Sequence, residues 1–214
     1  MNPLLTRSER NVVAHIFAGF LFNPLGRSYP SGVSAVLQRA GLLNKGDTLR
    51  SDEVTIAYEA QVRDLLFLNT SKPAARAPSA TAFDIAVKYR DAMGNDAMAC
   101  FEVKFLTRWK PPQLCQELKD CEYIKVQNGF SSCSLILLYP SWREPGTYPE
   151  KSIPGKVIQQ NWQDIRSSCQ QLADIEPDGR RLIEWMDSLR VPFNISNGGV
   201  KGPMKGLFDP PKSR

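Results

Sequence analysis

Two apolar segments near the middle of the chain, FDIAVKY at residues 83–89 and ACFEVKFL at residues 99–106, decide the fold. Both have the length of a strand and are rich in β-branched and aromatic side chains. Between them, Gly94 and Asn95 supply residue types that tight turns favour. The sequence therefore predicts an antiparallel hairpin, around which the other elements pack.

Three charged residues are embedded in this hairpin. Asp84 lies in the first segment, while Glu102 and Lys104 lie two positions apart in the second and so share a face of the strand with Cys100. Their apolar neighbours imply burial, and buried charges are costly unless they are paired or hold a metal. Two carboxylates form an oxygen-rich site suited to Mg²⁺, and a lysine beside it can orient an attacking water.

Helical and strand-like patterns flank the hairpin. The apolar spacing over residues 53–68 predicts a helix, and the polar, Pro/Ala-rich residues 69–82 predict a loop. Pro111 and Pro112 open a helix predicted to reach about residue 126, and the unbroken apolar run at 134–139 predicts a buried strand. Further helices are predicted at about 7–22, 33–40, 158–172 and 177–189.

The order and spacing of the charged residues resemble the PD-(D/E)XK nuclease superfamily. Asp84 is followed, after a spacer of seventeen residues, by Glu102-Val103-Lys104. Phe83 stands where this motif often has proline. The placement on paired strands, with a helix before and a helix and a strand after, is what distinguishes the match from a chance Glu-x-Lys.

The resemblance covers about residues 52–142 and implies an α/β fold. The expected architecture is a restriction-endonuclease-like core, with a central mixed β-sheet flanked by helices and with helical additions at the N-terminal and C-terminal sides. It also implies a separate strand before Asp84. That strand would lie within residues 69–82, unless the hairpin takes its role.

The resemblance also implies an activity, namely Mg²⁺-dependent hydrolysis of phosphodiester bonds in nucleic acid, with DNA expected and with Mn²⁺ as a substitute for Mg²⁺. Asp84 and Glu102 would hold the metal and Lys104 would position the water. Glu59, on the predicted helix, is the candidate for a third ligand, and a Glu59–Arg63 surface pair is the alternative. Cleavage of both strands of a duplex would favour a two-fold homodimer.

Other interpretations stay open at this point. The charged residues of the hairpin could form a structural ion-pair cluster in a nuclease-fold domain that binds nucleic acid or protein without cutting, and Lys88 could join a carboxylate there. Gln116 and Tyr123, on the helix after the hairpin, resemble a Gln/Tyr-bearing helix of several branches of the superfamily.

Basic residues point to a polyanionic partner. Six Lys and Arg against two acidic residues give +4 over residues 1–50, five against one give +4 over 190–214, and the net charge of +5 leaves −3 for the middle. The candidate nucleic-acid contacts are Arg108, Trp109, Lys110, Lys201 and Lys205. The alternatives are a solvated strand end for the first three and a tail that docks back on the protein for the last two.

The 214 residues, 42% of them hydrophobic, are enough to bury one good core. We expect an N-terminal helical segment at 1–50, a nuclease-like α/β core at 51–142, helices packed on that core at 143–190, and a basic, flexible tail at 191–214. No apolar run reaches the length of a membrane span, so no membrane partner is expected.

The five cysteines are odd in number and lack Cys-x-x-Cys spacing, which predicts reduced, buried thiols in a cytoplasmic protein. The single histidine, His15, lies in a predicted apolar helix and is interpreted as a core residue. We therefore expect no zinc or iron–sulfur site, and any metal should be held by oxygen.

Overall fold

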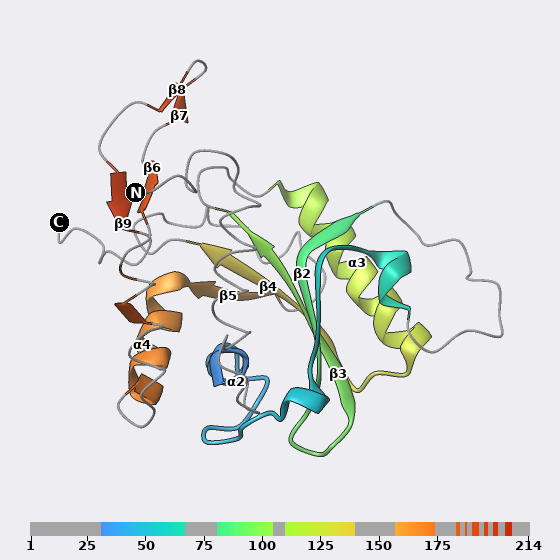
Figure 1. Ribbon diagram of the computed structural model, residues 1–214. Helices are drawn as coiled ribbons and strands as arrows, with labels where there is room; N and C mark the ends of the chain where they lie inside the picture. Colours follow the sequence, from blue (N-terminus) through green and yellow to red (C-terminus); the bar gives the residue numbers. More distant parts are fainter. Residues whose placement is uncertain are drawn as a thin grey trace.

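A computed structural model describes four continuous parts of the chain, residues 31–66, 81–104, 110–139 and 157–173. It also describes short pieces at 183–184, 187, 190–192, 195–196, 199–200 and 204–206. The described residues form a five-stranded mixed sheet with helices on both faces, which confirms the expected α/β class (Figure 1).

The sheet has the order β1-β2-β3-β4-β5. Its strands are β1 (Thr55–Gln61), β2 (Ala82–Arg90), β3 (Asp96–Val103), β4 (Cys133–Tyr139) and β5 (Val157–Asn161). The first three are antiparallel neighbours, whereas β3, β4 and β5 run parallel. The predicted hairpin is β2–β3, and Gly94 in its turn has φ of +80°, a conformation that glycine adopts without steric cost.

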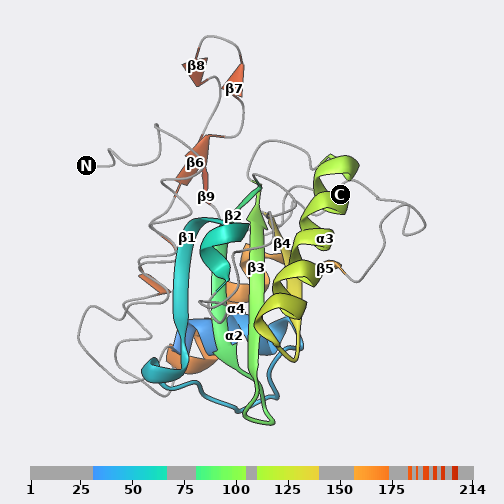
Figure 2. The same ribbon diagram turned by 90° about the vertical axis from the view of Figure 1, so that its right-hand side faces the viewer.

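Helices cover both faces of the sheet. The helix α3 (Pro111–Asn128) is the crossover between β3 and β4 and lies on one face, while α2 (Ser31–Arg39) and α4 (Trp162–Ala173) lie on the other (Figures 1 and 2). Each face has its own apolar core, because successive side chains of a strand point to opposite sides. Met98 and Cys100 of β3 face α3, and Glu102, two positions further along the strand, faces the same side.

The predicted helix over residues 53–68 is wrong. A short 3₁₀ turn at Ser51–Glu53 leads into β1, and a second follows at Val62–Leu65. The strand changes face at Glu59, which has φ of +46°: Ile56 and Tyr58 pack against the core on the α2 side, and Ala60 packs against the core on the α3 side. This change of face gives a strand the apolar spacing of a helix.

Other predictions have mixed outcomes. The helices at 33–40 and 113–126 and the strand at 134–139 are confirmed, while the segment predicted as helix from 158 begins as strand β5 and becomes helical at Trp162. Because β5 extends the central sheet, the core continues past residue 142. The predicted helix at 7–22 and nearly all of the 69–82 loop and the 177–189 helix lie outside the described residues.

The C-terminal segment, expected to be a flexible tail, contains two small antiparallel sheets. One pairs β6 (Arg190–Pro192) with β9 (Met204–Gly206), and the other pairs β7 (Ile195–Ser196) with β8 (Gly199–Val200). Among the helices that the structure describes, none is long and apolar enough to cross a membrane.

The end of α3 offers a direct test of its capping. Gly129 has φ of +68° and donates its N–H to Val126 O, and no atom lies within 4 Å of the position that a Cβ would occupy. We expect Gly129→Ala to lower the free energy of unfolding by about 1 kcal/mol, because only the left-handed backbone is penalised. Urea denaturation measures the change, and Gly129→Asn should cost less; an unchanged stability in Gly129→Ala would contradict this account of the cap.

Candidate functional site

The start of β2 and the end of β3 bring Asp84 and Glu102 together at one end of the sheet. Ile85 pairs with Phe101, so the register places the two carboxylates on adjacent strands facing α3. The backbone N–H of Val103 donates to Asp84 Oδ2 at 2.7 Å, which fixes the orientation of that carboxylate. The antiparallel pairing of the hairpin is therefore what makes two carboxylates eighteen positions apart into neighbours.

Glu102 is the centre of a polar network. Its Oε1 accepts hydrogen bonds from the Nζ of Lys104 and, at 2.7 Å, from the Nε2 of Gln113 on α3. The side chain of Glu102 is 4% exposed and that of Lys104 is 18% exposed, so the ion pair is largely shielded from water. The three residues that the sequence grouped as catalytic candidates thus lie at one place in the structure.

A third carboxylate, Glu117, joins them from α3. The Nε2 of Gln113 also donates to Glu117 Oε1 at 2.7 Å and so bridges the two glutamates. Glu117 is fully buried, and within the described part of the chain its Oε2 has no hydrogen-bond partner. We call Asp84, Glu102 and Glu117 the acidic cluster.

Sequence reasoning missed Gln113 and Glu117. Leu114 and Ile124 are fully buried on the same side of α3 as Glu117, at spacings of three and seven residues from it. The sequence did contain a signal for Glu117, because this glutamate lies between apolar residues at helical spacing in the helix after the hairpin. The third acid predicted from the sequence, Glu59, instead precedes the hairpin.

Burial and mutual repulsion raise the pKa of both glutamates. Burial, reinforced by the charge of Asp84 and opposed by Lys104 and Gln113, raises the pKa of Glu102 to about 6. Burial and the charge of Glu102, opposed by Gln113, raise the pKa of Glu117 to about 8. At neutral pH Glu117 is therefore mostly protonated and Glu102 mostly ionised, and a bound cation would displace the proton of Glu117.

The donor set fits a hard divalent cation. Asp84, Glu102 and Glu117 offer only carboxylate oxygens, the ligands that Mg²⁺ and Mn²⁺ prefer, and Glu117 Oε2 is a buried oxygen without a partner among the described residues. Lys104 and Gln113 are the groups that would reorient when these oxygens turn to a metal.

Glu59, the predicted third ligand, has a different setting from the one expected. It is an exposed residue of β1, not of a helix, and it lies across from Asp84 because Tyr58 pairs with Ile85 and Ala60 with Phe83. The helical spacing behind the proposed Glu59–Arg63 pair does not exist, and Arg63 contacts Asp64 at 3.5 Å. Glu59 is nevertheless a non-glycine residue with a positive φ, and it lies on the strand next to Asp84 of the acidic cluster.

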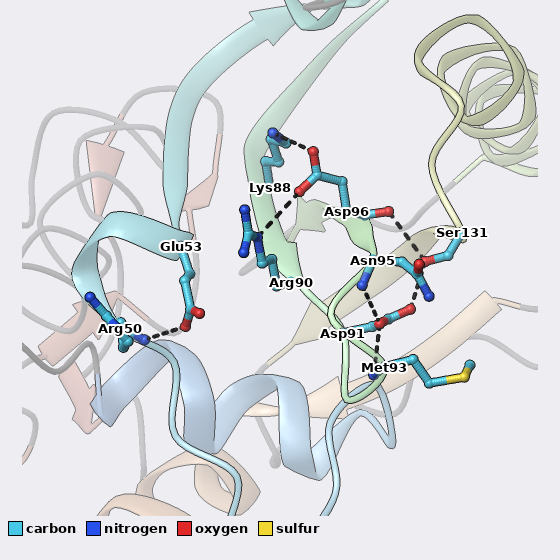
Figure 3. A network of polar contacts seen from close by, with 9 residues as sticks. All are labelled: Arg50, Glu53, Lys88, Arg90, Asp91, Met93, Asn95, Asp96 and Ser131. Carbon is cyan, nitrogen blue, oxygen red and sulfur yellow. Dashed lines mark hydrogen bonds and ion pairs between the residues drawn. The ribbon is translucent and has the colours of Figure 1, made fainter.

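Lys88 belongs to another network, at the opposite end of the hairpin (Figure 3). Its Nζ lies 2.8 Å from Asp96 Oδ2. Next to this pair, Asp91 Oδ1 accepts the N–H groups of Met93 and Asn95, and its Oδ2 accepts the hydroxyl of Ser131 (Figure 3). These contacts close the β2–β3 turn against the start of β4, which is a structural role.

The remaining candidates lie on α3, just before it, in β9 or outside the described residues. Gln116 donates to Asp120 Oδ1 at 3.1 Å, and Tyr123 is half-buried against the core on the α3 side. Lys110 is exposed just before α3, and Lys205 lies in β9. Arg108, Trp109 and Lys201 lie outside the described residues.

No protein-family model, no curated protein and no solved structure matches the chain. The strand order and the geometry of the acidic cluster are therefore the features that bear on function.

The raised pKa values predict how the metal-free protein responds to pH. Between about pH 4.5 and 8 the folded protein holds more protons than the unfolded chain, because Glu102 and Glu117 titrate near 6 and 8 when folded. Stability in a chelating buffer should therefore fall as pH rises through this window, at up to about 1.4 kcal/mol per pH unit for each group.

Glu117→Gln should flatten the upper part of this profile, from about pH 6.5 to 8, since an amide mimics the protonated acid and does not titrate. Urea denaturation at several pH values measures the slope. Glu122→Gln, which changes an exposed glutamate of the same helix, is the matched control. Parallel profiles for the wild type and Glu117→Gln would contradict the assignment.

Proposed function

We propose that this protein is a metal-dependent nuclease of the PD-(D/E)XK type, with a restriction-endonuclease-like core and Mg²⁺ as its cofactor. The observation that carries the proposal is the convergence of Asp84, Glu102 and Lys104 at one end of the sheet, where Glu117 adds a third, buried carboxylate. Buried charges at such density are expensive for a fold to keep, and a bound cation offsets that cost.

The connectivity of the sheet supports the same proposal. Three antiparallel strands are followed by a helix and by a fourth strand parallel to the third, and the candidate residues come from the second and third strands. The strand that the resemblance requires before Asp84 is supplied by β1, in the segment that the sequence pattern assigned to a helix. This removes the main departure of the sequence from the superfamily's element order.

Asp84 and Glu102 would hold the metal, with Glu117 as the third acidic residue in place of Glu59. When bound, Mg²⁺ would supply a hydroxide-like water at neutral pH and would stabilise negative charge on the phosphate. Asp84 is oriented for this role by the Val103 N–H, which occupies one of its oxygens. Gln113, bonded to both glutamates, would hold their relative positions.

Lys104 would act at the edge of this cluster. Its ammonium is paired with Glu102 and partly exposed, so it can turn from the carboxylate toward an attacking water or a phosphate oxygen. Arg108 and Lys110 follow Lys104 closely in the sequence, and Lys110 is exposed at the start of α3, so basic residues lie near Lys104 along the chain. With the basic ends of the chain, they support nucleic acid, DNA first, as the substrate.

Cleavage assays test the proposal. The full-length protein should cut plasmid, linear or single-stranded nucleic acid in Mg²⁺ or Mn²⁺, and Lys104→Ala should lower the rate by at least about 100-fold. Lys88→Ala is the matched control, since Lys88 lies on the same strand face as Asp84 but pairs with Asp96 and should leave cleavage unchanged. Absence of cleavage on all substrates, or equal rates in wild type and Lys104→Ala, would refute the proposal.

Metal titration tests whether Glu117 or Glu59 is the third acidic ligand. Calorimetric titration with Mn²⁺ should show binding in the wild type that is lost in Asp84→Asn and weakened on the order of 10-fold or more in Glu117→Gln. Glu59→Gln should bind as the wild type does, because that side chain is exposed on β1. Weaker Mn²⁺ binding in Glu59→Gln than in Glu117→Gln would instead identify Glu59 as the third ligand.

One observation favours a second candidate, a nuclease-fold domain that binds nucleic acid without cutting it. Lys104 and Gln113 both contact Glu102 Oε1, so the cluster is internally bonded without a metal. Mn²⁺ titration decides between the two: a wild-type protein that binds DNA but no metal would be the non-catalytic module.

A further inference from the structure

Three cysteines that are far apart in the sequence converge in the core. Cys100 on β3, Cys121 on α3 and Cys133 at the start of β4 have sulfur atoms that all lie within 4.8 Å of one another. Cys100 and Cys133 are in contact, at 3.8 Å between their Sγ atoms. We call these three residues the cysteine triad.

The triad lies between the sheet and α3, the same two layers that hold the acidic cluster. Along β3, Cys100 precedes Glu102 by two residues and so shares its face, and along α3, Cys121 follows Glu117 by one turn. Cys100 and Cys121 are buried, whereas Cys133 is only partly buried. Cys133 is therefore the least buried member of the triad.

The distances match thiolate coordination. A tetrahedral zinc with Zn–S bonds of about 2.3 Å separates its sulfur ligands by roughly 3.8 Å. The observed Cys100–Cys133 separation equals that value, and the other two separations in the triad exceed it by at most about 1 Å.

A disulfide between Cys100 and Cys133 fits the strand geometry poorly. Cys100 pairs with Leu135 and Cys133 pairs with Met98, so the two cysteines are offset by two residues on parallel strands. The strand geometry separates their Cα atoms by roughly 8 Å, beyond the limit of about 7 Å for a disulfide without backbone movement. Three soft donors that converge without forming a bond are suited to a thiophilic ion.

We propose that the cysteine triad is a binding site for Zn²⁺, held by the sulfur atoms of Cys100, Cys121 and Cys133, with the fourth position open toward the partly exposed side of Cys133. Binding replaces three S–H protons, which are released to solvent, and produces a site with a net charge of −1. No oxidant or reductant takes part. The ion would join α3 to β3 and β4 directly behind the acidic cluster.

The charges around Cys133 support this site. The thiols of Cys100 and Cys121 and the ammonium of Lys125 act to lower the pKa of Cys133, against burial and the charge of Glu122, and the net shift is downward. Lys125 would also face the negative charge that the complete site carries.

Metal titration of the full-length, reduced protein tests the proposal. In excess Mg²⁺, Zn²⁺ should bind at one ion per chain, and Cd²⁺ as a spectroscopic probe should give a sulfur-to-metal charge-transfer band. Cys133→Ser should weaken binding on the order of 100-fold or more and remove the band. Cys115→Ser, which changes a partly buried cysteine outside the triad, is the matched control and should bind as the wild type does.

A second measurement on the wild-type protein avoids any change to the core. Alkylation followed by peptide mass spectrometry should show that Zn²⁺ protects Cys133 and leaves the labelling of Cys115 unchanged. Glu102→Gln should keep the Cd²⁺ band, which separates this site from the acidic cluster and from the proposed nuclease activity. Absence of the band in the wild type, an equal band in Cys133→Ser, or Zn²⁺-independent labelling of Cys133 would overturn the proposal.

Discussion

Glu102 and Glu117 carry carboxylates into the interface between the sheet and α3, where water solvates them poorly. The structure answers that constraint with a lysine, a glutamine that donates to both acids, and pKa values raised toward or above neutrality. The residues around the glutamates also connect neighbouring elements. The backbone N–H of Lys104 donates to Leu138 O of β4, and Gln113 connects the first turn of α3 to Glu102 on β3. The hairpin register places Asp84 beside Glu102. The cost of burying negative charge thus connects the position of the helix, the pairing of the strands and the chemistry of the site.

The hairpin and the residues on it could be predicted because their signals are local. Alternation in the two central segments, the Gly94 turn and the prolines before α3 each determine structure over a few residues. β1 could not be predicted in this way. The backbone at Glu59 turns the residues after it toward the other face of the sheet, so the apolar residues of this strand have the spacing of a helix. Only the pairing of β1 with β2 removes the ambiguity.

Glu117 and the cysteine triad show a different limit. Their partners lie on other elements, and their proximity depends on which face of α3 packs against which residues of β3 and β4. A search for Cys-x-x-Cys pairs, or for an acid preceding the hairpin, looks only along the chain. The informative pattern was Glu117 and Cys121 between Leu114 and Ile124, at the spacings that bring residues to one side of a helix.

The two prolines at the start of α3 have a consequence for how this end of the sheet can bind anions. A helix N-terminus normally presents unpaired N–H groups, but Pro111 and Pro112 have none, and the Leu114 N–H is bonded to Lys110 O. The first turn of the helix, which contacts Glu102 through Gln113, therefore has little capacity to chelate an oxyanion through its backbone. Any phosphate placed there has to be neutralised by side chains or by a cation, and the exposed Lys110 stands at that terminus.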